Sequence, residues 1–369
     1  MKIVFTGGGT GGHIFPIIAI IREMKKISKG ASLSLFFIGP KDDYSLTILS
    51  GEEIKIKNII VGKLRRYFSF KNFFDFFKIL TGIIQAFFYL FILNPDLVFS
   101  KGGYGSFPVS FAARILHIPI FLHESDIIPG LATKIEGKWV EEIFISFAHT
   151  KFFPKEKIIL VGNPTRTEIL EGSKEKAKKI FNLTEEKPVI LILGGSQGAQ
   201  KINDTILEIL AEFIKNFEII HSTGEKNFNQ VRSEAETVIS SADLKYYHPF
   251  PFLNEEYLKN GLAAADLIIS RAGAGSIFEI AAKGKPSILI PLSTSASNHQ
   301  IENGYAYAEN GASLIIEEEN LKPHFFLERI NSLFLRPQML GKMAQQAKIF
   351  SKPKAAKIIA SYLLEYLNL

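Results

Sequence analysis

The chain has 369 residues, 47% of them hydrophobic and 22% charged, so it is long enough for two domains, and its composition excludes intrinsic disorder. It contains no cysteine, which excludes disulfides, thiolate catalysis and cysteine-ligated metal. The net charge of +6 comes from residues 1–163, which contain 20 Lys and Arg and 13 Asp and Glu. This basic excess indicates either an anionic partner, such as a membrane surface or a lipid diphosphate, or a face that is merely solvated.

Apolar strand-like runs alternate with helical stretches along the whole chain. Strands are expected at 2–6, 32–38, 96–100, 118–122, 143–146, 158–161, 188–193, 217–221, 244–247, 266–270, 286–290 and 312–316. Strands that alternate with helices imply βαβ units and parallel sheets. The break is expected at residues 162–164, which gives domains 1–163 and 164–349. The last helical stretch, 350–369, could pack back on the first domain or belong to the second.

The first strand runs into a glycine-rich turn with the sequence GGGTGGH, residues 7–13. Glycines at a strand end let backbone N–H groups approach an anion, and the helix that follows adds partial positive charge. The second strand ends without the acidic residue that holds a ribose in dinucleotide-binding domains. His13 could accept a proton from a hydroxyl at neutral pH, or it could only position the loop.

Residues 73–93 have almost the composition of a membrane span, but Asp75 and Lys78 interrupt them. The uncharged part begins at Ile79 and is shorter than the ~20 residues that a span needs. We therefore expect a buried helix of the first sheet. The preceding residues, 63–74, mix basic and aromatic side chains, which suits either a surface against anionic lipid or core aromatics beside solvated cations.

Three further motifs follow strand ends in the first domain. A second glycine turn, SKGGYGSFP, occupies 100–108. HESDIIPG, residues 123–130, supplies Glu124 and Asp126, which could act as acid and base, bind ligand hydroxyls or cap the next helix. GNPTR, residues 162–166, places an arginine where it could pair with a diphosphate.

The second half repeats the pattern with GGSQGAQ at 194–200, SRAGAGSIFE at 270–279 and SNHQIEN at 297–303. Glu279 could accept both hydroxyls of a ribose, or it could be a surface carboxylate on a tight helix–sheet contact. The amide of Gln300 suits sugar hydroxyls. We find no metal-ligand spacing, no Walker lysine motif and no DxD signature, so we expect no metal or other cofactor. Helix dipoles and an arginine would then stabilise a departing diphosphate.

Together the seven motifs, from residue 3 to about residue 305, resemble the MurG family of peripheral membrane N-acetylglucosaminyltransferases. The resemblance implies a GT-B fold of two Rossmann-like domains facing a cleft. The first domain would bind the membrane and lipid I, and the second would bind UDP-N-acetylglucosamine. One departure is Asp126, which replaces an asparagine that is common in the family.

The resemblance also implies roles for individual residues. His13 is the favoured catalytic base, with Asp126 and Glu124 as the other catalytic candidates. Donor contacts are expected at Thr10, Gly11, Gly12, Asp126, Arg166, Ser196, Leu253, Ala272, Gly273, Glu279 and Gln300. Acceptor contacts are expected at Gly8, Gly9, His13, Gly103, Tyr104, Gly105 and Ser106.

The implied reaction is an inverting transfer of N-acetylglucosamine from UDP-N-acetylglucosamine to the 4-hydroxyl of lipid I, which forms lipid II at the cytoplasmic face of the cell membrane. Partners would be these two substrates, an anionic membrane surface and other enzymes of cell-wall synthesis, but no nucleic acid. Two alternatives stay open. One is another membrane-associated GT-B enzyme, such as a diacylglycerol glycosyltransferase. The other is a nucleotide-binding doubly wound module or a dehydrogenase.

Overall fold

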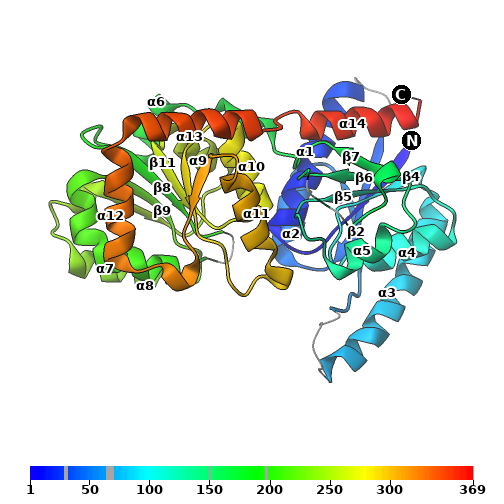
Figure 1. Cartoon of the computed structure of the whole chain (residues 1–369). Coiled ribbons are helices and arrows are strands. Elements are labelled where there is room, and N and C mark those ends of the chain that lie inside the picture. The colour runs from blue at the N-terminus through cyan, green and yellow to red at the C-terminus, as the bar shows by residue number, and fades with distance from the viewer. Residues whose placement is uncertain (29–31, 64–69, 149, 151, 196–197, 369) are drawn as a thin grey trace. The chain divides into compact units, whose positions relative to one another are not determined.

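A computed structural model describes every residue except 29–31, 64–69, 149, 151, 196–197 and 369 (Figure 1). The described residues form two compact units, Met1–Arg166 with Lys352–Leu369, and Thr167–Ser351. Each unit is a parallel β-sheet with helices on both faces. The α/β class with two parallel sheets, predicted from the alternating pattern, is confirmed.

The described part of the first unit has a seven-stranded sheet in the order β3-β2-β1-β4-β5-β6-β7. Apart from Lys2, the residues of its central strands are buried, and most of them are apolar on both faces, as in other parallel sheets. The strands are β1 Lys2–Thr6, β2 Ser34–Pro40, β3 Lys55–Ile59, β4 Leu97–Ser100, β5 Ile120–Glu124, β6 Glu142–Ile145 and β7 Ile158–Leu160.

Two groups of helices cover this sheet. On one face lie α1 Gly11–Ser28 and α2 Asp43–Ser50, together with α14 Ala355–Tyr366, which returns from the end of the chain to pack on α1. On the other face lie α3 Lys71–Leu93, α4 Phe107–Ile115 and α5 Leu131–Glu136. The last segment of the chain therefore completes the core of the first unit.

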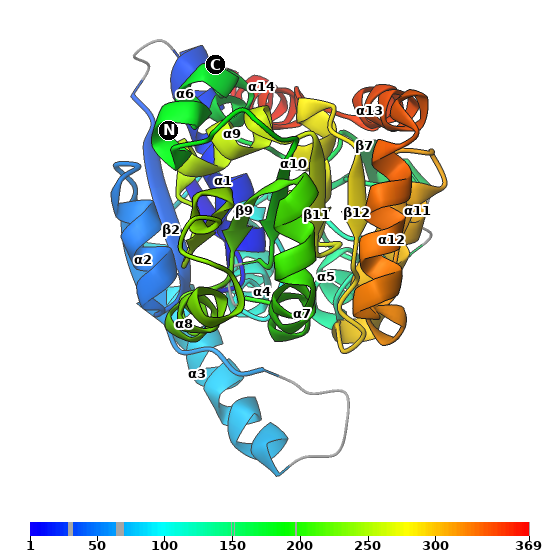
Figure 2. The same ribbon diagram turned by 90° about the vertical axis from the view of Figure 1, so that its left-hand side faces the viewer.

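The described part of the second unit has a six-stranded sheet in the order β10-β9-β8-β11-β12-β13 (Figure 2). The strands are β8 Val189–Leu193, β9 Glu218–Ser222, β10 Tyr247–Phe250, β11 Leu267–Ser270, β12 Ser287–Leu289 and β13 Ser313–Ile315. The helices are α6 Lys174–Phe181, α7 Gln200–Asn216, α8 Phe228–Val238, α9 Glu255–Ala264, α10 Ala274–Lys283, α11 His299–Ala308, α12 Pro323–Phe334 and α13 Pro337–Phe350. The apolar faces of α7, α8 and α12 share one core with the sheet.

Two strands differ from the sequence prediction. The edge strand β3 was missed because its sequence, KIKNI, alternates charged and apolar residues and stays half exposed. The strand expected at 244–247 begins only at Tyr247, since Leu244–Tyr246 forms a short 3₁₀ helix. Both errors fall at sheet edges, where the hydrophobic signal is weakest.

The expectation of a buried helix at 73–93 needs correction. By length and composition Asn72–Leu93 could cross a membrane, yet only 22% of its most apolar stretch is buried within the structure. Both ribbon views show the N-terminal half of α3 extending away from the sheet that its C-terminal half covers (Figures 1 and 2). The outward side carries large apolar side chains, which we call the exposed α3 face: Phe70, Phe73, Phe74, Phe76, Phe77, Leu80, Ile84, Phe88, Phe91 and Ile92.

Candidate functional site

The first sheet reverses its strand order at β1, because β2 and β4 flank β1 on opposite sides. In open parallel sheets, ligands bind outside the carboxyl ends of the strands at such a switch point. The turns after β1 and β4 meet there. The backbone N–H of Gly8 donates to the carbonyl oxygen of Gly102 at 3.1 Å. The backbone N–H of Lys101 donates to the carbonyl oxygen of Thr6 at 2.8 Å. The structure therefore brings together the two glycine turns singled out in the sequence.

His13 lies between these turns, in the first turn of α1. Its Nδ1 is 2.9 Å from the hydroxyl oxygen of Thr10. A Cβ on Gly103 would lie 2.9 Å from Nε2, and one on Gly8 would lie 3.1 Å from Cε1, so a side chain at either position would crowd the ring. If Nδ1–H donates to Thr10, Nε2 keeps its lone pair and can accept a proton. Gly11 and Gly12 open the same helix and keep its start free of side chains.

A carboxylate does lie beside the first turn, two residues beyond the end of β2. A Cβ on Gly9 would lie 2.8 Å from Oδ2 of Asp42 and 3.4 Å from the hydroxyl of Tyr104. Burial raises the pKa of Tyr104, and the negative charge of Asp42 adds to this effect. The strand itself ends without an acidic residue, as the sequence analysis stated, but Asp42 brings a carboxylate to the first glycine turn from the loop that follows.

Gly105 and Ser106 complete the second turn and lead into α4. A Cβ on Gly105 would lie 2.5 Å from the carbonyl oxygen of Gly7, so the two turns can approach this closely only with glycine here. Ser106 is the N-cap residue of α4 and is fully buried. Its hydroxyl faces the interior of the unit, toward Gly103 and Glu136, and its expected contact with the acceptor stays a prediction.

Lys101, which the sequence analysis did not single out, joins the second turn to the segment with the candidate carboxylates. It is only 3% exposed, and its Nζ donates to the hydroxyl of Ser125 at 2.5 Å, which donates to Oδ1 of Asn163 at 2.7 Å. Burial lowers the pKa of Lys101 to about 8, and the charges of Glu124 and Asp126 oppose this shift. A lysine directly between a buried strand and two glycines was the available signal.

The two candidate carboxylates have different surroundings. Glu124 ends β5 and is buried, and its Oε1 accepts the backbone N–H of Asp126 at 2.9 Å. This bond holds the Glu124 carboxylate within its own loop. Asp126 is half-buried, so its side chain is the more accessible of the two.

The GNPTR motif lies against the same edge of the first unit. His123 Nε2 is 3.0 Å from the carbonyl oxygen of Gly162, and burial lowers the pKa of His123 well below its usual range, so the ring is neutral and donates there. The guanidinium of Arg166 lies 4.1 Å from the ring centroid of Phe15 in α1. Arg166 therefore contacts α1 at Phe15, two residues after His13.

The second sheet has its own switch point at β8, which lies between β9 and β11. Ser196, in the turn after β8, lies outside the described residues. After β11, Gly273 is the N-cap residue of α10, and a Cβ on Gly273 or Gly275 would meet no atom within 4 Å. The first N–H groups of α10 therefore border open space, which suits an anion.

The remaining donor candidates lie on the elements around α10. Ala272 is buried just before the helix, and Glu279 is half-buried within it. Leu253 is buried between β10 and α9. Gln300 lies in the first turn of α11, where its Oε1 accepts the backbone N–H of Leu292 at 3.0 Å. This bond fixes the amide group and leaves its nitrogen to donate to a ligand.

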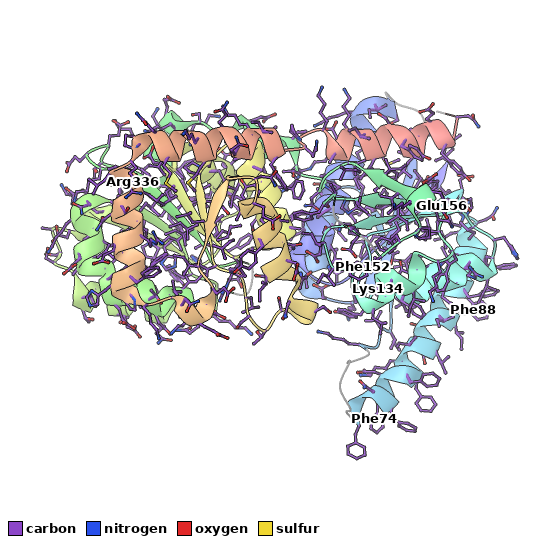
Figure 3. The ribbon with its side chains drawn as sticks, in the orientation of Figure 1. Phe74, Phe88, Lys134, Phe152, Glu156 and Arg336 are labelled. Carbon is purple, nitrogen blue, oxygen red and sulfur yellow. The ribbon has the colours of Figure 1, made fainter. Side chains whose placement is uncertain are left out.

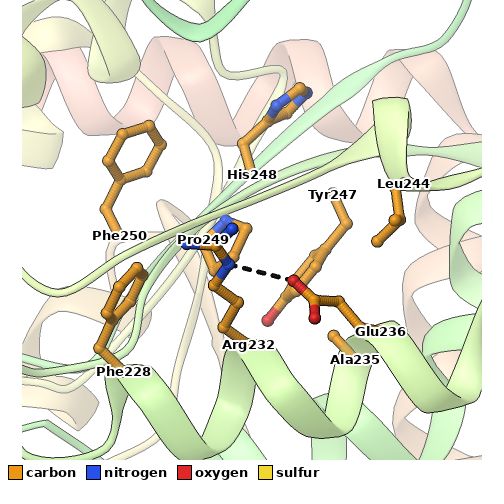
Figure 4. Close-up of a pocket in the computed structure, with 9 residues that line it drawn as sticks. All are labelled: Phe228, Arg232, Ala235, Glu236, Leu244, Tyr247, His248, Pro249 and Phe250. Carbon is orange, nitrogen blue, oxygen red and sulfur yellow. Dashed lines mark hydrogen bonds and ion pairs between the residues drawn. The ribbon is translucent and has the colours of Figure 1, made fainter. Parts of the chain in front are cut away.

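A pocket of about 350 Å³ lies elsewhere in the second unit, between α8 and β10 (Figure 4). Its lining residues are Phe228, Arg232, Ala235, Glu236, Leu244, Tyr247, His248, Pro249 and Phe250. Arg232 and Glu236, two exposed residues of α8 in this lining, form an ion pair of 3.1 Å. No residue predicted for catalysis or binding lines this pocket. Within the described ranges, no three His, Asp or Glu side chains are grouped so that they could hold a metal ion.

Family profiles match most of the chain. Residues 3–145 match the glycosyltransferase family 28 N-terminal domain, and residues 189–359 match the glycosyltransferase family 28 C-terminal domain. Two curated relatives carry the name UDP-N-acetylglucosamine–N-acetylmuramyl-(pentapeptide) pyrophosphoryl-undecaprenol N-acetylglucosamine transferase. The Treponema denticola protein is 36% identical, over 99% of this chain and 97% of its own length. The Clostridium tetani protein is 40% identical, over 90% of both chains.

Solved structures share the fold. The MurG structure from Acinetobacter baumannii matches with a TM-score of 0.74, at 24% identity over 99% of both chains. A UDP-GlcNAc 2-epimerase from Neisseria meningitidis, bound to UDP-GlcNAc, matches with a TM-score of 0.71, at 19% identity over 99% of this chain and 100% of its own. Both matches concern the fold alone, whereas the curated relatives are similar in sequence from end to end. The chain therefore belongs to the MurG family of glycosyltransferases, within glycosyltransferase family 28.

Proposed function

We propose that the chain transfers N-acetylglucosamine from UDP-N-acetylglucosamine to the 4-hydroxyl of undecaprenyl-diphospho-N-acetylmuramoyl-pentapeptide, lipid I, and so forms lipid II. The relatives named for this transfer cover nearly the whole chain, which supports the proposal. The observation that carries the mechanism is the His13 ring, held by Thr10 between two glycine turns at the switch point of the first sheet.

In the proposed reaction, His13 Nε2 takes the proton of the acceptor hydroxyl. The hydroxyl oxygen attacks the anomeric carbon of the donor, on the face opposite the diphosphate. The bond from that carbon to the phosphate oxygen breaks, and its electrons leave with UDP. Inversion follows from this single displacement. The acceptor would lie along the backbone of Gly8, Gly9, Gly103 and Gly105, with the hydroxyl of Tyr104 beside it.

The donor would be held mainly by the second unit. The open start of α10, at Ala272 and Gly273, would receive the diphosphate, helped by Ser196 and Arg166. Glu279 would accept both ribose hydroxyls, and the backbone at Leu253 would meet the uracil. The nitrogen of Gln300, together with Thr10, Gly11, Gly12 and Asp126, would lie near the sugar. A carboxylate at 126 can only accept hydrogen bonds, whereas the asparagine common in the family can also donate them.

We further propose that the first unit binds the cytoplasmic face of the membrane peripherally through the exposed α3 face. Phe74 and Phe88 point away from the ribbon on this helix (Figure 3). The helix buries one stripe, including Asp75, which pairs with Lys78 at 3.2 Å. The rest of this stripe is apolar and packs on the first unit, so the open apolar side is the one left to enter the membrane interface. The basic residues Arg65 and Arg66 lie outside the described residues, while Lys63 is exposed next to them.

Two other functions are compatible with parts of the chain. A diacylglycerol glycosyltransferase would share the donor unit but not usually both glycine turns of the first unit. A dehydrogenase would use an acidic residue after β2, and Asp42 occupies that region. The similarity to transferases over the whole chain favours lipid I as acceptor over both.

The test is incubation with UDP-N-acetylglucosamine and a short-chain lipid I analogue, followed by mass spectrometry. The expected product is the analogue plus one N-acetylhexosamine, both before and after exhaustive chelation. Transfer to diacylglycerol instead, or binding of NAD in place of UDP, would support an alternative. Activity that chelation abolishes and Mg²⁺ or Mn²⁺ restores would overturn the expected metal independence.

A further inference from the structure

Glu136 lies beneath the second glycine turn and was not among the sequence candidates. It is the last residue of α5 and is fully buried. Its Oε2 accepts hydrogen bonds from the hydroxyls of Ser100, at 2.6 Å, and Ser110, at 3.1 Å. Its Oε1 lies 2.6 Å from the hydroxyl oxygen of Ser106. One buried carboxyl group therefore links the end of β4 to the start of α4.

Two of these serines connect Glu136 to the turn itself. The hydroxyl of Ser100 accepts the backbone N–H of Gly102 at 3.1 Å. The hydroxyl of Ser106 lies 2.8 Å from the carbonyl oxygen of Gly103. Both glycines have left-handed backbone, with φ of +75° and +88°, a conformation that needs support from its surroundings. On its other side, this turn contacts Gly8 and the ring of His13.

The hydrogen count of this network favours a protonated Glu136. Ser106 carries one hydroxyl hydrogen but lies within bonding distance of two acceptors, the carbonyl of Gly103 and Oε1 of Glu136. A proton on Oε1 can be donated to Ser106, whose own hydrogen then goes to Gly103, and every group is satisfied. An ionised Oε1 would attract the Ser106 hydrogen, because charge-assisted bonds are stronger. The carbonyl of Gly103 would then keep only its longer bond from the backbone N–H of Ser106, at 3.2 Å.

We propose that Glu136 is a positioning residue whose protonated carboxyl group holds the Gly102–Gly103 turn against His13. The consequence for acceptor binding rests on the proposed function, because the turn lines the acceptor site only if that function is right. When Glu136 loses its proton, the turn loosens and the acceptor binds less well.

The surroundings of Glu136 allow this titration near neutrality. Burial raises its pKa to about 7, and the bonds from Ser100, Ser106 and Ser110 limit the rise. The charged or titratable residues of the elements packed against it are Arg114 on α4, Lys101 and Tyr104 in the turn, His123 and Glu124 on β5, and Lys134 on α5. The rise of the Glu136 pKa comes from burial, against the opposing effect of the hydroxyls, and not from any of these charges.

The variant Glu136→Gln tests the proposal, because a glutamine can donate to Ser106 and accept from Ser100 as the protonated acid does. Glu141→Gln, an exposed residue of the same unit, is the matched control. Amide hydrogen exchange of residues 101–106 is measured without substrate from pH 6 to pH 8.5 and corrected for intrinsic rates. Above pH 7 we expect the wild type and Glu141→Gln to exchange faster than Glu136→Gln. Equal protection of all three proteins at every pH would overturn the proposal.

Kinetics provide the second measurement. The measured quantity is the ratio of kcat/KM for the acceptor in Glu136→Gln to that in the wild type. This ratio should increase about threefold to tenfold from pH 6.5 to pH 8.5, because the variant lacks the ionisation that weakens acceptor binding in the wild type. The change should lie in KM for the acceptor, with UDP affinity unchanged. Glu136→Leu, which breaks the serine bonds, should raise that KM at every pH. Parallel profiles of wild type and Glu136→Gln would contradict the proposal. An enzyme that makes no product at all would refute the proposed function, while the exchange experiment would still decide the role of Glu136.

Discussion

His13 is where the proposed chemistry begins, since its ring is oriented by Thr10 and enclosed by two glycines. Replacing it with alanine should lower turnover by about 10²–10⁴-fold, as expected for the loss of a general base. UDP affinity should barely change. Single-turnover kinetics beside the control His324→Ala, an exposed histidine on α12, measure this. Turnover within a few-fold of wild type would make His13 structural and move the role to Asp126, because Glu124 is engaged by its own loop.

Glu279 is the residue that should distinguish a nucleotide site with a ribose contact from a bare anion site. Glu279→Ala should weaken UDP binding by roughly 1–3 kcal/mol if a charge-assisted contact to the ribose hydroxyls is lost. Calorimetric titration with UDP gives the value, and Glu309→Ala, an exposed glutamate after α11, is the control. Unchanged affinity in a folded Glu279→Ala protein would discard this role.

Glu136 should also leave a signature in stability. Its pKa in the folded protein is about 7, above the usual 4.5, so the folded state keeps a proton that the unfolded state loses between these values. The contribution of Glu136 to the free energy of unfolding is therefore complete below pH 4.5. As the pH rises to about 7, roughly 3 kcal/mol of that free energy is lost. Urea unfolding of wild type and Glu136→Gln from pH 5 to pH 8 measures the difference. A constant difference across this range would show that Glu136 does not titrate there.

At the scale of single residues, the sequence showed which motifs follow strand ends, but not which hydrogen-bond partners their side chains have. The motifs at 7–13 and 100–108 were recognisable because glycines after buried strands have few structural uses. Lys101 and Glu136 were missed because their importance comes from burial and from serines far along the chain. Ser106 could be read only as a ligand contact until its hydroxyl was seen to face Glu136.

At the scale of elements, α3 decides how the chain meets a membrane. Exposed apolar area there should add to the attraction between the basic first unit and anionic lipid, and salt should weaken the electrostatic part. Combined replacement of Phe74, Phe77 and Phe88 by serine should therefore reduce binding to anionic vesicles without affecting UDP binding. Charge reversal at Lys63, Arg65 and Arg66 should reduce it too, and more strongly at low salt.

Vesicle co-sedimentation across a salt series is the measurement, with Phe325→Ser, an exposed residue of α12, as the control. Retention on neutral lipid that neither salt nor carbonate reverses would instead indicate that α3 spans the membrane. The helix at residues 73–93 was predicted correctly from the sequence, but the prediction that it is buried was wrong. Hydrophobicity all round a helix usually means a buried one, and only the structure shows that the first half of α3 has no sheet beneath it.

At the scale of the whole molecule, the alternating pattern was sufficient for two parallel sheets because buried parallel strands are apolar on both faces. The pattern could not predict the return of α14, since an amphipathic helix at the end of a chain can pack on either unit. The site is less predictable than the fold. The same fold, with a TM-score of 0.71, belongs to an epimerase of a UDP sugar, so the reaction depends on residues at the switch points and not on the architecture.

The stereochemistry of the product tests the central claim most directly. The enzyme is incubated with UDP-N-acetylglucosamine and a soluble lipid I analogue, and the purified product is examined by NMR for its new linkage. The account predicts one N-acetylglucosamine on the 4-hydroxyl of the muramyl sugar in the β configuration, inverted from the donor. An α linkage, attachment to another hydroxyl, or a free sugar epimerised or hydrolysed from UDP would contradict it.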